Sequence, residues 1–294
     1  MAPRFPRRRL SWLLVPILAF TPLLVTAPAA RADLVQNVGG GRGTIDWSSG
    51  TITVTGSGAP PDRGTVASKR LMALRAARVD ALRQLGEIVN GVKVDSETTV
   101  KDFTVDSDTI HAQMSALIRG AQQSGEPRYL SDGSVEVDLV LPMYGQGNVA
   151  DVLQPAKPEN RSKEHPSTEC KLSPTSVTDS YTSVIVDCRG LGGQPAMSPT
   201  ILDSSGGELY LGKREMGEEF ADFVIEHGIV AYAHSDGEAR QDGRAGNAPL
   251  ILRAKRISGK FKADAVLADA DAQKLLGAEA QSKLLTNAKV IFIL

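Results

Sequence analysis

Residues 66–89 carry the pattern that most constrains the fold of this chain. Apolar side chains recur there at spacings of three and four residues, or their sum, and the run ends at Asn90-Gly91. This periodicity is typical of an amphipathic α-helix, and the Asn-Gly pair is a stop signal. We therefore expect a long helix that forms the core of its domain through one apolar stripe: Leu71, Leu74, Leu82, Leu85 and Val89.

Segments on both sides of this helix alternate apolar and polar residues. The alternation over residues 44–55 surrounds a Ser-Ser-Gly turn, and that over residues 128–141 surrounds an Asp-Gly turn. Alternation around a short polar turn predicts a β-hairpin with one buried face. We expect the apolar stripe of the helix, including Leu82, to be buried against these hairpins.

The segment between the helix and the second hairpin is less regular. Several β-branched residues over 92–105 predict a strand with an irregular middle. A short helix is expected over 110–118, capped by Ser107 or Asp108 and ended by Gly120. The first domain would therefore have the element order ββαβαββ.

Composition shifts mark the limits of that domain. Residues 151–174 hold four prolines among charged residues without apolar periodicity, which indicates a linker. Residues 33–43 are polar and then glycine-rich, and we expect a flexible leader there. The ββαβαββ domain would then occupy residues 44–150, an ordinary size for a domain.

The remaining residues predict a second, smaller unit over 175–294. Strand-like segments lie near 177–188 and 250–257, and a hairpin is expected near 200–211. Residues 263–294 have the pattern of a strand, a helix and a final apolar strand, which indicates one β-α-β crossover onto a mixed sheet. The whole chain is therefore expected to be α+β, with two small domains built on mixed or antiparallel sheets.

The N-terminal segment has the features of a secretory signal peptide. Residues 1–32 begin with several arginines, continue with an apolar stretch over 10–25, and end in the small residues Ala30 and Ala32 around an arginine. We expect cleavage before Asp33 and export to the periplasm. An uncleaved membrane anchor and twin-arginine export are the alternatives, and no nearby cysteine could carry a lipid.

Composition limits the class of partner. The hydrophobic fraction of 41% is enough for a packed core. Five of the 33 basic residues lie in residues 1–32, so 28 basic residues remain against 34 acidic ones, a formal charge of about −6 after cleavage. This acidic balance argues against a global nucleic-acid-binding role, which normally needs a basic face to neutralise phosphates, so we expect no nucleic-acid partner. After the signal peptide no apolar run is long enough to cross a membrane.

Cys170 and Cys188 are the only cysteines of the chain. An even number of cysteines in an exported protein favours a disulfide, so we expect a Cys170–Cys188 bond. Two buried thiols are the alternative. Redox chemistry is not indicated, because no Cys-x-x-Cys pair occurs.

No residue pattern predicts a catalytic, cofactor-binding or metal site. The segment 207–214 nearly matches a phosphate-binding loop, but it ends in arginine where Mg²⁺ binding needs a hydroxyl group. His227 and His234 would point to opposite faces of a regular strand, which does not suit a shared metal ion. The common serine-nucleophile motifs are absent after residue 32.

Part of the first domain resembles a known family. The run from Ser68 to Leu85 with the segment 90–96, the tetrapeptide 118–121 and the hairpin 129–141 resemble the N-terminal domain of the flagellar assembly protein FlgT and the LPP-type outer-membrane lipoproteins of about twenty kilodaltons. The resemblance covers residues 60–143. It implies a periplasmic or outer-membrane-associated envelope protein without enzymatic residues.

These observations favour a non-catalytic envelope protein that acts through protein–protein interaction, and the resemblance implies a role in envelope or flagellar assembly. A small-molecule or glycan-binding module is the alternative, although an aromatic content of only 5% weighs against stacking on sugars. A hydrolase is a lesser alternative. The identity of the partners does not follow from the sequence.

Overall fold

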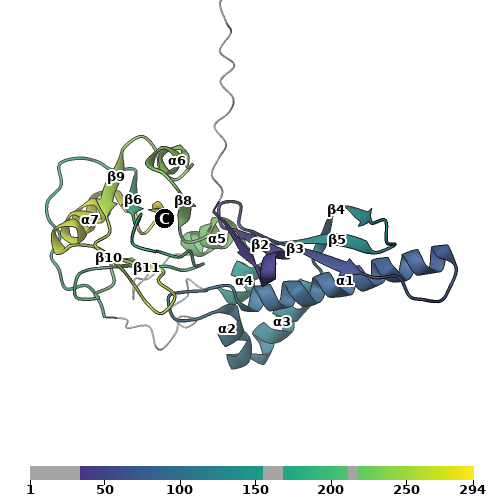
Figure 1. Ribbon diagram of the computed structural model, residues 1–294. Coiled ribbons are helices and arrows are strands. Elements are labelled where there is room, and N and C mark those ends of the chain that lie inside the picture. The colour runs from purple at the N-terminus through teal and green to yellow at the C-terminus, as the bar shows by residue number, and fades with distance from the viewer. Residues whose placement is uncertain (1–33, 155–167, 211–217) are drawn as a thin grey trace, which may run out of the picture. The chain divides into compact units, whose positions relative to one another are not determined.

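The computed structural model describes residues 34–154, 168–210 and 218–294 (Figure 1). The predicted signal peptide and most of the predicted linker lie outside the described residues. Helices combine with antiparallel, mixed and parallel sheets, which confirms the α+β prediction. None of the helices within the described ranges combines the length and the apolar composition of a membrane-spanning segment.

An antiparallel five-stranded sheet organises the N-terminal half, with the strand order β1-β2-β3-β5-β4. Both hairpins predicted for the first domain are confirmed, β2 with β3 and β4 with β5, and β3 pairs with β5 at the centre. Helix α1 lies along one face of this sheet (Figure 1). The bounds are β1 Val35–Val38, β2 Gly43–Asp46, β3 Thr51–Gly58, α1 Val66–Asn90, β4 Gln122–Tyr129 and β5 Val135–Pro142.

Helix α1 confirms the predicted helix, but only Leu85 and Val89 of the expected stripe are fully buried. Ala73, Ala77 and Ala81 are fully buried, whereas Leu71 is 49% exposed. The reason lies in β3, where a Cβ on Gly56 would stand 2.3 Å from the backbone oxygen of Ala77. Helix and strand therefore approach so closely that only small side chains fit between them.

The segment expected to be a flexible leader contains regular secondary structure. Its residues form β1 and the short 3₁₀ helix η1, Gly39–Gly41, before β2. Strand β1 pairs with β2 from Val35 opposite Asp46 to Val38 opposite Gly43. Glycine permits this connection, because all three residues of η1 have positive φ.

The strand predicted over 92–105 is also wrong. This segment contains α2, Val100–Asp106, which starts at a capping box between Thr99 and Asp102. The local cap outweighs the β preference of the branched residues. Helix α3, Asp108–Arg119, confirms the next prediction, with Ser107 as its N-cap and Gly120 as its C-cap. The order ββαβαββ is thus corrected to three strands, three helices and two strands, followed by the short helix α4, Val149–Leu153.

The C-terminal half contains two further sheets. One has four parallel strands in the order β8-β12-β6-β9, and the other has three strands in the order β10-β11-β7. The strands are β6 Ser183–Asp187, β7 Ile201–Leu202, β8 Ala231–Ala233, β9 Pro249–Arg253, β10 Arg256–Ser258, β11 Asp264–Val266 and β12 Val290–Ile293. The helices are α5 Glu218–His227, α6 Asp236–Gln241 and α7 Asp269–Ser282.

The predicted β-α-β ending requires a correction. Its strand, helix and strand exist as β11, α7 and β12, but β11 pairs with β7 whereas β12 pairs with β6 and β8. The crossover therefore connects two sheets. Strand β12 is buried along its whole length, which suits the centre of a parallel sheet covered on both faces.

Main-chain hydrogen bonds join the two halves of the described chain. The amides of Met197 and Ser198 donate to the carbonyls of Lys93 and Val94, at 3.0 and 2.6 Å. The apolar core is continuous across both halves. The division into domains 44–150 and 175–294 stays a prediction.

Candidate functional site

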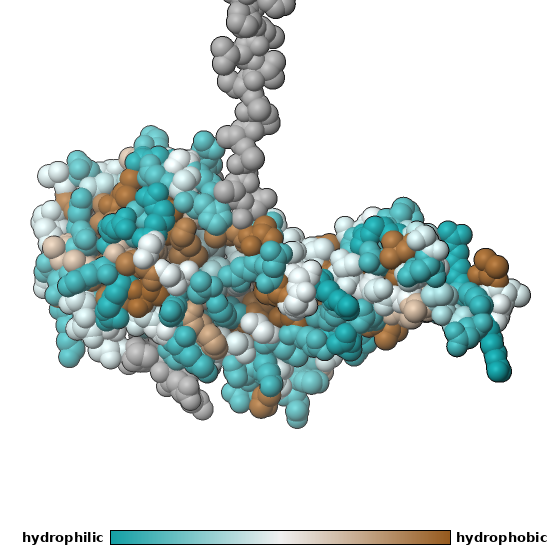
Figure 2. All heavy atoms as spheres, viewed as in Figure 1, coloured by the Kyte–Doolittle hydropathy of each residue, from teal (hydrophilic) through white to brown (hydrophobic). Residues whose placement is uncertain are grey.

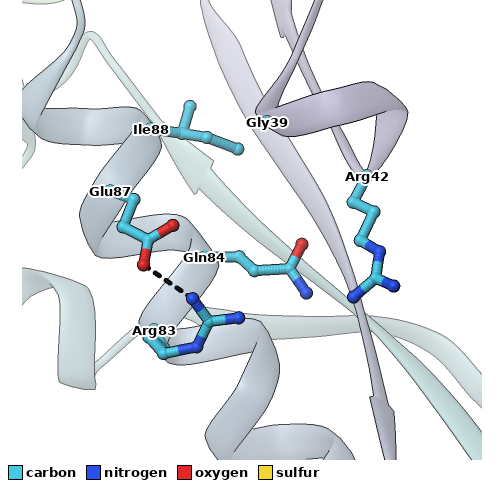
Figure 3. Close-up of a pocket in the computed structure, with 6 residues that line it drawn as sticks. All are labelled: Gly39, Arg42, Arg83, Gln84, Glu87 and Ile88. Carbon is cyan, nitrogen blue, oxygen red and sulfur yellow. Dashed lines mark hydrogen bonds and ion pairs between the residues drawn. The ribbon is translucent and has the colours of Figure 1, made fainter.

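A small cavity lies between η1 and the C-terminal half of α1 (Figure 3). It has a volume of about 200 Å³. Four of its lining residues come from two successive turns of α1, and the other two come from the β1–β2 connection. They are Gly39, Arg42, Arg83, Gln84, Glu87 and Ile88.

Local backbone geometry brings the β1–β2 connection close to α1. A Cβ on Gly39 would lie 3.3 Å from the Ile88 side chain, and one on Gly43 would lie only 2.3 Å from it. Ile88 is itself buried in the core. Glycine is therefore required where the connection passes over Ile88, and this contact fixes the apolar end of the cavity.

Gln84 is the most informative residue of the cavity. Its side-chain nitrogen Nε2 donates to Asp80 at 2.7 Å. Only the NH₂ group can donate to a carboxylate, so this bond fixes the amide orientation and leaves Oε1 on the other side. That oxygen is buried without a hydrogen-bond partner, and the residue is only 6% exposed. An unsatisfied buried acceptor typically costs about 1–3 kcal/mol.

Charged groups flank Gln84 on both sides. Arg83 donates to Asp80 at 2.9 Å and to Glu87 at 2.6 Å. Burial alone would raise the pKa of Asp80, but hydrogen bonds from the Ser57 amide, Arg83 and Gln84 lower it overall. Asp80 is therefore a carboxylate at neutral pH, which keeps the Gln84 amide oriented.

Arg42 faces Gln84 from the side opposite Arg83 (Figure 3). Its side chain is exposed and forms no hydrogen bond or ion pair with the residues that the structure describes. The cavity thus combines a free guanidinium group with a buried acceptor oxygen. This arrangement can bind a small polar molecule, but it offers no nucleophile.

A second, larger hollow lies between α3 and α4, lined by residues that include Gln113, Leu117 and Asp151. Its volume is about 670 Å³. None of the described residues that line this hollow has a buried side-chain atom without a hydrogen-bond partner, so the hollow lacks the feature that points to a ligand beside Gln84.

The two cysteines stand as free thiols in the structure. Burial, aided by Asp187, raises the pKa of the Cys188 thiol to about 12. Burial and a hydrogen bond to Asp203 raise the pKa of the Cys170 thiol to about 11. Both groups are protonated at neutral pH and are poor nucleophiles. The Cys170–Cys188 bond stays a prediction, which titration of thiols in the denatured, unreduced protein would decide.

His227 and His234 do not lie on one strand. His227 ends α5, where its ring stacks near Phe223 at 4.7 Å, and His234 follows β8. Among the described residues, no three His, Cys, Asp or Glu side chains gather where they could hold a metal ion. In the near-match to a phosphate loop, Gly207 belongs to a tight turn and donates to Asp203, while residues 211–217 lie outside the described chain.

Sequence reasoning missed the cavity because its residues belong to segments with different predicted roles. Arg42 lay in the expected leader, and Gln84 lay in a helix whose expected buried stripe contained only leucines and a valine. The one available signal was Gln84 itself, a polar residue next to the apolar Leu85 on the buried side of α1.

Comparison with known families gives a match over the C-terminal part of the chain. Residues 183–294 match the family described as the second domain of Treponema pallidum Tp0624. This span is less than half of the chain and covers the parallel sheet with α5, α6 and α7. No curated protein matches the chain.

This result corrects the resemblance to FlgT and the LPP-type lipoproteins. Residues 60–143, which carried it, lie outside the matched span, and the matched family is neither of the two. The resemblance rested on the periodicity of α1 and on hairpin order, which many α+β proteins share. A role in flagellar assembly therefore loses its basis.

Proposed function

We propose that this chain is a non-catalytic protein of the bacterial envelope, periplasmic or associated with the outer membrane, that acts by binding another envelope protein. The observation that carries the proposal is the exposed first half of α1, residues 66–79. Its partner surface is expected to be acidic and to contain an apolar groove.

The sheet covers only one side of α1, and α2 and α3 pack against its later turns (Figure 1). The first half keeps large apolar side chains in solvent. Val66 is 85% exposed, Val79 67% and Met72 52%. Figure 2 shows such apolar residues among polar ones over α1 and the β4–β5 hairpin. An apolar surface on an exposed helix is a feature of protein interfaces.

The charge of the same segment indicates the charge of the partner surface. Residues 66–79 contain Lys69, Arg70, Arg75 and Arg78 and no acidic residue. Arg70 stacks on the Tyr129 ring at 3.8 Å, which holds an arginine and an exposed aromatic ring together. A segment with basic residues and no acidic ones favours an acidic partner surface.

Two further features support the proposal. The signal peptide predicted over residues 1–32 would deliver the chain to the envelope. The high pKa of both thiols argues against cysteine nucleophiles.

Site-specific photocrosslinking in cells tests the proposal. A photoreactive residue at Met72 or Val79 is expected to form an adduct of one defined mass with an acidic envelope protein. The same residue at Thr53, on the opposite face of the sheet, is the matched control. Equal adducts at all three positions, no adduct from α1, or transfer only to lipid would contradict the proposal.

Small-molecule binding is the second candidate, because one observation favours it: the unpartnered oxygen of Gln84 in the cavity beside η1.

A further inference from the structure

We propose that the cavity between η1 and α1 binds a small zwitterion carrying an ammonium group and a carboxylate, as a free α-amino acid does. This inference does not depend on the proposed protein partner, because the cavity lies at the other end of α1 from residues 66–79.

The buried oxygen of Gln84 sets the first requirement. Oε1 accepts hydrogen bonds only, and its amide cannot turn over without placing that oxygen against the Asp80 carboxylate. A ligand must therefore bring a donor. An ammonium group offers three donors, whereas a carboxylate or sulfate ion would face an acceptor.

The charges around Gln84 set the second requirement. The two carboxylates of Asp80 and Glu87 balance the two guanidinium groups of Arg83 and Arg42, so the formal charge around the cavity is zero. A ligand that carries a net charge would therefore not be neutralised there. The signs are nevertheless separated in space. Glu87 lies beyond Arg83 on one side of Gln84, and Arg42 lies on the other (Figure 3). A zwitterion can place its ammonium group toward the Gln84 oxygen and its carboxylate toward Arg42.

Size sets the third requirement. About 200 Å³ is below the roughly 300–1,000 Å³ of sites for drug-sized ligands, so the ligand is compact. Ile88 supplies an apolar wall, and a side chain on Gly39 would reduce the space beside it. An amino acid with a small apolar side chain satisfies these limits.

Calorimetric titration of the mature protein with alanine, alaninamide and propionate tests the inference. Alanine is expected to bind with 1:1 stoichiometry. Alaninamide lacks the carboxylate and propionate lacks the ammonium group, so each is expected to bind at least about tenfold more weakly. Absence of alanine binding, or equal binding of alanine and propionate, would overturn the proposal.

Variants connect that binding to this cavity. Arg42→Gln is expected to weaken alanine binding about tenfold, whereas Arg63→Gln, at an exposed arginine outside the cavity, should leave it unchanged. Gln84→Leu should abolish binding. Because Gln84→Leu also removes the hydrogen bond to Asp80 and could disturb folding, exposed Arg42 gives the decisive comparison. Unchanged affinity in Arg42→Gln would show that alanine binds elsewhere.

Discussion

Leu82 and Leu85 lie three residues apart on α1 but have different surroundings. Leu85 is fully buried, whereas Leu82 is only partly buried at the edge of the core. The sequence pattern gave both the same role, because periodicity identifies an apolar stripe without showing which neighbours cover it. The distance between helix and sheet decides that, and Gly56 and Gly58 control this distance.

This difference predicts unequal costs of truncation. Leu85→Ala is expected to lower the free energy of unfolding by about 2–5 kcal/mol, because it leaves a cavity in a closed core. Leu82→Ala should cost less, about 1–2 kcal/mol, since solvent can fill part of the space. Urea denaturation of both variants measures the difference. A larger loss for Leu82→Ala would show that the buried face of α1 is misplaced.

Asp187, at the end of β6, predicts a dependence of stability on pH. A hydrogen bond from Arg189, opposed by burial and aided by the charge of Arg253, lowers the pKa of Asp187 to about 2. A depressed pKa stabilises the fold above the unfolded value of about 3.9, and this contribution is lost as pH falls from 4 toward 2. Since both arginines are about half exposed, we expect Asp187 to contribute about 1–2 kcal/mol to the free energy of unfolding.

The substitution Asp187→Asn should remove that dependence. Denaturant midpoints measured between pH 5 and pH 2 are expected to fall less steeply in the variant than in the wild type. Parallel curves for the two proteins would show that the ion pairs of Asp187 do not contribute to stability.

At the scale of elements, α1 shows how far sequence reasoning reaches. The helix, α3 and both hairpins follow from local patterns, because their caps, turns and periodicity lie within a few residues. The prediction for residues 92–105 was wrong, because their β-branched composition indicated a strand, whereas the capping box at Thr99 starts helix α2. The cavity could not be predicted, because it forms only where the β1–β2 connection, which is distant in sequence, lies beside Gln84 and α1.

The close contact of α1 with β3 predicts opposite effects for two glycine substitutions. A Cβ on Gly58 would lie 2.2 Å from the backbone oxygen of Ala73, whereas one on Gly86 meets no atom within 4 Å. Gly58→Ala is expected to destabilise the protein by roughly 1–3 kcal/mol or more, through overpacking. Gly86→Ala should stabilise it by up to about 1 kcal/mol, through helix propensity. Thermal unfolding measures both, and equal effects would contradict this packing.

At the scale of the whole molecule, the parallel sheet was the least predictable part. Strands β6, β8, β9 and β12 are short and distant in sequence, so their order depends on long-range pairing that no local pattern contains. The contacts between the two halves of the chain could not be predicted either, because they also join residues that are distant in sequence. Trp47 meets Tyr232 edge to face at 6.0 Å, and the Phe261 amide donates to the Ser96 carbonyl at 2.8 Å.

These contacts predict the behaviour of a cleaved chain. Limited proteolysis within the predicted linker, residues 151–174, is expected to give two fragments that stay together during gel filtration without denaturant. The reason is the continuous core and the main-chain hydrogen bonds between the halves. Fragments that elute separately would show instead that the halves are independent domains.

The first half of α1 is proposed as the binding surface for an acidic partner. Charge reversal at its exposed arginines, Arg75→Glu with Arg78→Glu, tests it most directly when combined with the photocrosslinker at Met72. Both arginines are exposed, so stability should change little. The exposed pair Lys255 and Arg256, reversed in the same way, is the matched control.

We predict that reversal on α1 lowers the yield of the Met72 adduct at least about tenfold, through lost attraction and new repulsion between like charges. The control pair should leave the yield unchanged, and both variants should melt like the wild type. An adduct yield that survives the reversal on α1 would contradict binding of an acidic partner through Arg75 and Arg78.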